Sequence, residues 1–277
     1  MSDTYAKYSD VIKLQLFIIS LAYFLHLKNL GLADNAIHVS ASKSSILPMK
    51  TKLLLLPAFT AFSLSANAAS YLTGGHIDGP AFGYDSLTGF EPHYHNEGGG
   101  DGAVVDGVVQ TTESEYEPGE LIVVVPQSST ITVSSTNYYW LPETETAAAN
   151  NGTPFLGIGL EELDPLDWVG GTVTLTLLSI SGPGDLLLWK DSDGGPNIFL
   201  DSANSMMGFN LNAGTHTHFN WGFTELGLYD LEFQISGEHV ADGLQSGSAT
   251  YTFMVPEPTT ALLGAIGALG LLRRRRA

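Results

Sequence analysis

The sequence predicts an all-β protein, with a single antiparallel β-sandwich domain over residues 69–254. Short runs of β-branched and aromatic residues alternate with polar residues, which is the period-two pattern of half-buried strands. Gly, Pro and Asn separate these runs, and no part of the domain has the pattern of a long amphipathic helix. Roughly eight short strands joined by long loops are therefore expected.

Runs of β-branched residues predict the strands at 120–126 and 129–134, and alternation predicts the clearest of the later ones. In the clearest case, 171–180, three Thr residues alternate with Val and Leu, and in 229–235 aromatic and aliphatic residues alternate with acids and Gln. The polar, Ala-rich segment 143–154 is expected to be a long loop. The next segment, 155–163, is either a short helix or irregular, because its glycines weaken a helix. The expected strands span 120–126, 129–134, 171–180, 185–190, 214–223, 229–235 and 248–254.

The strand expected at 214–223 carries the first candidate chemistry. Side chains in a strand alternate between its two faces. Phe219 and Trp221 then belong to an aromatic core face, while His216, His218 and Asn220 lie on the opposite face. Two imidazoles that are two residues apart on a strand point the same way and can ligate one metal ion.

Three more histidines extend this pattern. His93 and His95 form a second His-x-His pair and His76 lies upstream, so five of the eight histidines fall in three places. Imidazoles with one or two carboxylates suit zinc or copper. Asp78 and Glu97 are candidates for further ligands or for orienting partners. The alternative for each histidine is a polar surface residue or a hydrogen-bonded bridge between loops.

The charge of the domain limits its partners. Between residues 69 and 255 there are 12 Asp and 13 Glu against one basic residue, Lys190. Such a domain repels nucleic acid and anionic membrane surfaces and attracts cations, although solubility in salty water is an alternative reason for the acids. The chain has no Cys. Thiolate zinc sites, iron–sulfur clusters and Cys nucleophiles are therefore excluded.

The N-terminal region contains a secretory signal at residues 49–68. Lys50 and Lys52 precede an apolar run over 53–64, and Ala66-Asn67-Ala68 has the small-x-small pattern of a cleavage site. This pattern predicts passage through the Sec translocase and removal by signal peptidase. We expect translation to start at Met49, with residues 1–48 an artefact of gene-start assignment. The alternative is an uncleaved N-terminal anchor.

The C-terminal region has three parts: a Pro-Glu-Pro motif, an apolar run over 259–272 and an Arg cluster. This arrangement resembles the PEP-CTERM sorting signal of Gram-negative bacteria. The resemblance implies a sorting helix at 255–277, transient membrane anchoring, processing by an exosortase-type peptidase and delivery to the cell surface or extracellular matrix. The residues that carry it are Pro256, Glu257, Pro258, Arg273, Arg274, Arg275 and Arg276.

A second resemblance covers most of the domain. The matching stretches are Leu-Thr-Gly-Gly-His-Ile-Asp at 72–78, Trp-Leu-Pro-Glu-Thr at 140–144, Gly-Pro-Gly-Asp at 182–185 and His-Thr-His-Phe-Asn-Trp-Gly-Phe at 216–223. They resemble the choice-of-anchor M domain, also seen as the actinobacterial surface-anchored repeat. In actinobacteria such domains are associated with metal-type ABC transporter systems, which implies metal capture with transporter components as partners. This chain departs in its anchor and in a long gap at 150–168.

Three functions are compatible with these features. The favoured one is a binding domain that captures zinc or copper through the His-x-His pairs. The alternative is a structural or adhesive matrix protein that binds exopolysaccharide or, less favoured than a transition metal, calcium; Tyr138, Tyr139 and Trp140 would then offer a sugar-binding platform. The chain lacks His-Glu-x-x-His, Gly-x-Ser-x-Gly and Ser-x-x-Lys motifs. We therefore expect no enzymatic activity.

Overall fold

A computed structural model describes residues 69–257. In this range the protein consists mainly of β-strands arranged in three sheets, which confirms the all-β prediction. No helix in the described part of the chain is long and apolar enough to cross a membrane. The expected extension at 1–48, the signal peptide at 49–68 and the sorting residues Pro258 and Arg273–Arg276 lie outside the described residues.

The described chain contains many short strands, one α-helix and two short 3-10 helices. The elements are, in order, β1 Ser70–Gly74, β2 His76–Asp85, β3 Gly89–Asn96, β4 Val104–Val105, β5 Val108–Val109, β6 Ser114–Tyr116, η2 Pro118–Glu120, β7 Leu121–Val124, β8 Thr130–Val133, β9 Thr136–Leu141, α2 Glu145–Asn151, β10 Phe155–Gly159, η3 Val169–Gly171, β11 Thr172–Ser181, β12 Leu186–Lys190, β13 Asn197–Asp201, β14 Gly208–Asn212, β15 His216–His218, β16 Asn220–Phe223, β17 Gly227–His239 and β18 Gly243–Val255.

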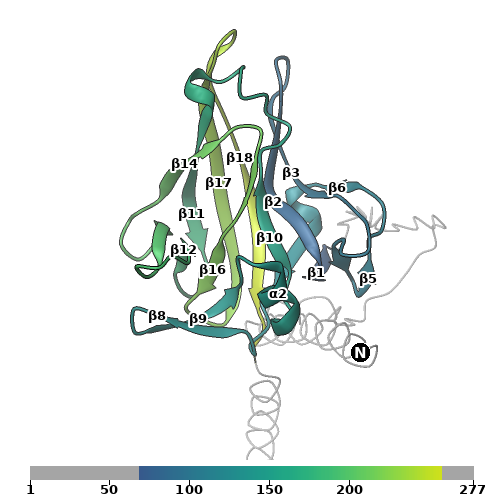
Figure 1. The fold of residues 1–277 in the computed structure, drawn as a ribbon, viewed down its shortest axis with the longest axis vertical. Helices are drawn as coiled ribbons and strands as arrows, with labels where there is room; N and C mark the ends of the chain where they lie inside the picture. The colour runs from purple at the N-terminus through teal and green to yellow at the C-terminus, as the bar shows by residue number, and fades with distance from the viewer. Residues whose placement is uncertain (1–68, 258–277) are drawn as a thin grey trace, which may run out of the picture. The chain divides into compact units, whose positions relative to one another are not determined.

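These strands form three sheets, which we call A, B and C. Sheet A has eight strands in the order β14-β11-β17-β18-β7-β1-β4-β5. Sheet B has the order β15-β10-β2-β3-β6, and sheet C has the order β13-β12-β16-β9-β8. The long hairpin of β17 and β18 runs through the middle of sheet A (Figure 1).

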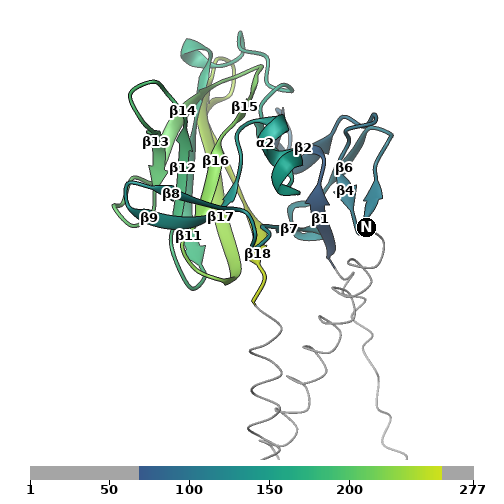
Figure 2. The same cartoon turned by 60° about the horizontal axis from the view of Figure 1, so that its bottom comes forward.

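Sheets B and C pack on the same face of sheet A, as the two views of the ribbon show (Figures 1 and 2). Phe253 of β18 stacks on Trp221 of sheet C, with ring centroids 5.4 Å apart. Tyr251 lies two residues earlier on the same strand face. Its ring packs edge-on against Tyr94 of sheet B, with ring centroids 5.1 Å apart. Residues of all three sheets therefore join in one large apolar core.

The predicted sandwich is not purely antiparallel. β7 runs parallel to both β1 and β18, and β10 runs parallel to β2. The described residues also contain 18 strands instead of the roughly eight expected. Alternation cannot reveal strand direction, because a strand with one buried face has the same pattern in either orientation.

The expected strand at 214–223 is divided in the structure. β15 belongs to sheet B and β16 to sheet C, and Phe219 lies between them. All four residues of β16 are buried, including Asn220, which was expected on the polar face with the histidines. Asn220 Oδ1 accepts hydrogen bonds from Trp140 Nε1 and from the backbone N–H of Glu143. These two hydrogen bonds satisfy the amide oxygen of Asn220 in the core, whereas its Nδ2 is buried without a hydrogen-bond partner.

The segment 143–163 also differs from its prediction. The expected loop contains the short helix α2, and the segment expected to be helical or irregular contains β10. β10 has two glycines, which lower the propensity for either structure. Its strand conformation comes from pairing with β2 on one side and β15 on the other. These are long-range contacts that local sequence does not show.

Replacement of Trp221 tests the packing of sheet C on sheet A. Trp221 is fully buried, as predicted, and its replacement by Ala should lower the free energy of unfolding by ~3–5 kcal/mol through lost burial and cavity formation. Urea denaturation measures the change. Leu244→Ala is the control, because Leu244 is 85% exposed and its truncation should alter stability by less than ~0.5 kcal/mol. Equal effects of the two substitutions would contradict the assigned core.

Candidate metal centre

The candidate histidines lie on the face of sheet B that is turned away from sheet A. Tyr94 of β3 packs toward sheet A, so its neighbours His93 and His95 project to the other side. Asp78 of β2 is directly opposite His95 in the strand pairing. Residues opposite each other on paired strands share a face. β3 and β2 therefore present histidines and a carboxylate on one surface.

The pairing of β10 extends this row to β15. Gly157 of β10 is opposite Asp78 on one side and His218 on the other, while Gly159 is opposite His216. A β-carbon at position 157 would overlap Asp78 Oδ1, and one at 159 would lie 3.0 Å from the Asp78 β-carbon. The two glycines that obscured the strand in the sequence thus leave the space that Asp78 occupies.

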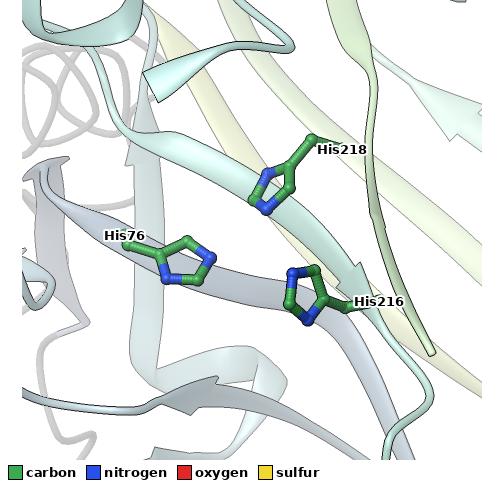
Figure 3. A group of neighbouring side chains, drawn as sticks. All are labelled: His76, His216 and His218. Carbon is green, nitrogen blue, oxygen red and sulfur yellow. The ribbon is translucent and has the colours of Figure 1, made fainter. Parts of the chain in front are cut away.

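Three histidines converge above this part of the sheet. His76 comes from β2, and His216 and His218 come from β15. Each offers a ring nitrogen within 4.8 Å of the other two, and the rings point toward a shared space (Figure 3). The ring centroids are 5.1 Å apart for His76 and His218 and 5.9 Å apart for His76 and His216. We call this group the histidine trio.

The environment keeps two members of the trio uncharged. Burial, with the neighbouring His76 and His216 adding to it, lowers the pKa of His218 to about 3. Burial also lowers the pKa of His76. The His218 ring stacks on Phe155 at a centroid distance of 3.6 Å. His76 Nε2 and His218 Nδ1 are buried without a hydrogen-bond partner, so neutral imidazole nitrogens remain available to a ligand.

Carboxylates surround the trio. Asp78 is 2% exposed, and its Oδ1, which has no hydrogen-bond partner, lies 3.8 Å from His76 Nε2. Burial, followed by repulsion from Glu161, raises the pKa of Asp78 to about 7. Glu161 Oε1 lies 2.5 Å from His216 Nδ1. Ligand atoms of Asp78, Glu97, Glu161 and His216 also lie within 4.8 Å of one another.

The structure separates the other His-x-His pair from the trio. His93 and His95 gather with Glu162 in a group of their own. Sequence reasoning identified all five histidines, Asp78 and Glu97, but missed Glu161 and Glu162. These two acids lie two and three residues after the end of β10. To place these acids near the histidines, the sequence would have had to show that β10 is a strand paired with β2.

The aromatic segment proposed as a sugar platform is half-buried. Tyr138, Tyr139 and Trp140 are on β9, which lies between β16 and β8 in sheet C. The ring centroids of Tyr138 and Trp189 are 6.1 Å apart, and Trp140 donates a hydrogen bond to Asn220. These contacts bind the segment to the core of the sandwich.

The close approach of Asp78 to Gly157 can be tested by a substitution at the glycine. Gly157→Ala should lower the free energy of unfolding by about 1–3 kcal/mol, because the new methyl group overlaps Asp78. Gly194→Ala is the matched control, since a β-carbon there meets no atom within 4 Å. Thermal denaturation of the two variants measures the difference. Similar stability in both would show that Asp78 does not lie over β10.

The depressed pKa of His218 predicts a pH effect in the metal-free protein. The unfolded chain binds a proton at His218 below about pH 6.5, whereas the folded protein does so only near pH 3. His218 therefore contributes nothing above pH 6.5 and destabilises the fold progressively as the pH falls toward 4. Relative to His218→Gln, the wild type should lose on the order of 2 kcal/mol between pH 7 and 4, after allowance for solvent screening.

Urea denaturation of both proteins at each pH, in the presence of a chelator, measures this difference. Asp78 has the opposite effect: its pKa is higher in the folded protein than in the unfolded chain, so its protonation stabilises the fold as the pH falls. The comparison with His218→Gln cancels this contribution, since Asp78 is present in both proteins. A constant difference in stability between pH 7 and 4 would contradict the burial of a neutral His218.

Comparison with known proteins identifies the C-terminal segment. Residues 255–276 match the model of the PEP-CTERM protein-sorting motif. No curated protein and no solved structure matches the chain. The motif indicates export and membrane-anchored sorting in a Gram-negative bacterium, with processing by exosortase. The resemblance of residues 69–254 to choice-of-anchor M domains stays a prediction, because the matched segment lies outside that range.

The sorting motif begins inside the folded domain. Its first residue, Val255, is the last residue of β18 and is fully buried. Gln127 Nε2 donates a hydrogen bond to the carbonyl oxygen of Pro256. The match begins at residue 255, where the sequence predicted the sorting signal to begin, and it overlaps the folded domain by one residue because Val255 continues the pairing of β18 with β17.

Proposed function

We propose that this exported protein is a non-enzymatic binding domain that captures zinc or copper through His76, His216 and His218. The observation that carries the proposal is the convergence of three ring nitrogens within 4.8 Å. Two members of the trio have buried nitrogens that lack a hydrogen-bond partner. A metal ion would satisfy these nitrogens, whose burial is otherwise unfavourable.

The donor set supports a transition metal over calcium. Imidazole suits zinc and copper, whereas calcium takes six to eight oxygen ligands. Three imidazoles leave a further position of a tetrahedral zinc open to water or a ligand. Glu161 faces His216 Nδ1 and would orient this ring from outside the centre, which is a common arrangement at histidine-bound metals.

The surroundings favour cation capture outside the cytoplasm. The nearby carboxylates of Asp78, Glu97 and Glu161 and the acidic domain as a whole attract cations. Delivery to the cell surface or to the extracellular matrix would expose the domain to metal in the surroundings. We further propose that components of a metal transporter receive the ion. The alternative is a matrix protein that binds exopolysaccharide or calcium through its acidic surface.

Calorimetric titration of zinc into the metal-free full-length protein at about pH 7.5 tests the function, because unperturbed imidazoles are neutral there. The wild type should bind with high affinity, and His216→Ala/His218→Ala should lose the site in the trio. His239→Gln is the control, since His239 lies next to Asp242, outside the candidate groups. Circular dichroism establishes that each variant is folded.

Two results would contradict the proposal. Equal heats and affinities in the wild type and the double variant would remove His216 and His218 from the site. Absence of saturable zinc or copper binding to the wild type would favour the matrix-protein alternative.

A further inference from the structure

We propose a second metal site on the same face of sheet B, in which His93, His95 and Glu162 hold a divalent transition ion through two imidazoles and one carboxylate. Their ligand atoms lie within 4.8 Å of one another. None of the three residues belongs to the histidine trio. The inference extends the proposed metal-binding function to a second site, and the two sites can fail separately in the experiment below.

The hydrogen bond of His93 determines which ring nitrogen is free. Its Nδ1 lies 2.9 Å from the carbonyl oxygen of Glu91. A carbonyl oxygen only accepts hydrogen bonds, so Nδ1 carries the hydrogen and donates it. In the neutral ring, Nε2 then has a lone pair. This nitrogen is buried without a hydrogen-bond partner in a residue that is only 8% exposed.

The free nitrogen of His93 faces a carboxylate. Glu162 Oε1 lies 3.3 Å from His93 Nε2 and 3.7 Å from His95 Nδ1. A lone pair and a carboxylate oxygen repel each other unless a proton or a cation lies between them. Zinc bonds of about 2.0–2.2 Å in tetrahedral geometry place two ligand atoms about 3.4 Å apart. The observed separations therefore agree with two edges of a coordination tetrahedron.

Both histidines also have the outer partners of metal ligands. A ligating histidine usually donates its other N–H to a carbonyl or a carboxylate, which fixes the ring. His93 has the Glu91 carbonyl in this role. His95 Nε2 lies 3.4 Å from Glu113 Oε1, so the opposite nitrogen, Nδ1, is directed at Glu162. The two rings thus present lone pairs to the same carboxylate.

The group is open on one side. The side chain of Glu162 is 42% exposed, whereas those of His93 and His95 are 10% and 20% exposed. Solvent can therefore reach the carboxylate, and an ion can enter past it. Three protein ligands leave at least one coordination position for water or another ligand. The two-nitrogen, one-oxygen set is harder than the trio and suits zinc or ferrous iron.

Zinc stoichiometry distinguishes the two sites. The full-length protein is stripped with a chelator, dialysed against zinc and analysed for bound zinc per chain. The wild type should bind two ions. His216→Ala/His218→Ala and His95→Ala/Glu162→Gln should each bind one, and the combined variant should bind none.

Glu162→Gln provides the sharper measurement, because this half-exposed side chain can be changed with little risk to the fold. It should weaken zinc binding at the site of His93, His95 and Glu162 at least about tenfold, while the trio should still bind one ion. Glu238→Gln is the matched control, since Glu238 is an exposed residue of β17 in sheet A. The control should bind zinc like the wild type.

The outcomes separate the two proposals. One bound ion that is lost in the His216/His218 variant but kept in His95→Ala/Glu162→Gln would overturn the second site and leave the proposed function intact. One ion that is lost only in His95→Ala/Glu162→Gln would overturn the trio and support the second site. No bound zinc would overturn both.

Discussion

The structure depends on the apolar face of β18 in sheet A, against which both smaller sheets are buried. Tyr251 contacts sheet B and Phe253 contacts sheet C, although the two residues are neighbours on one strand face. Aromatic residues supply large buried areas per side chain, which matters in a chain without disulfides. Because this face buries one side of sheet B, the opposite side is available for polar residues. The position of the histidines follows from this constraint.

The candidate centre combines groups whose charges are suppressed by the same burial. Desolvation lowers the pKa of His218 and raises the pKa of Asp78, so both groups favour their neutral forms. Neutral imidazoles are ready to bind a metal, while a buried carboxylate without a partner is unfavourable when ionised. A bound cation would stabilise the ionised carboxylate, so metal binding would release a proton where Asp78 is still protonated.

Local features of this fold, such as strand positions and the faces of side chains, could be predicted from the sequence, whereas the pairing of distant strands could not. Alternation located β11 within one residue at each end, and the His-x-His spacing correctly placed each pair on one strand face. Neither pattern could show that β10 lies between β2 and β15, because this pairing joins segments that are far apart in the chain. Glu161 and Glu162 were missed for the same reason. Asn220 escaped because its buried hydrogen bonds come from β9 and the residues after it.

Asp78 connects the two groups of histidines. It is opposite His95 in the pairing of β2 with β3 and lies beside His76 on its own strand. Attraction from His216 and from His95 acts on its carboxyl group from the two sides. An ion bound in either group would therefore change the electrostatic potential at Asp78. Because two cations repel, it would also lower the affinity of the other group for a second ion. Since Gly157 and Gly159 allow Asp78 to approach β10, this coupling depends on a strand with no side chains at those two positions.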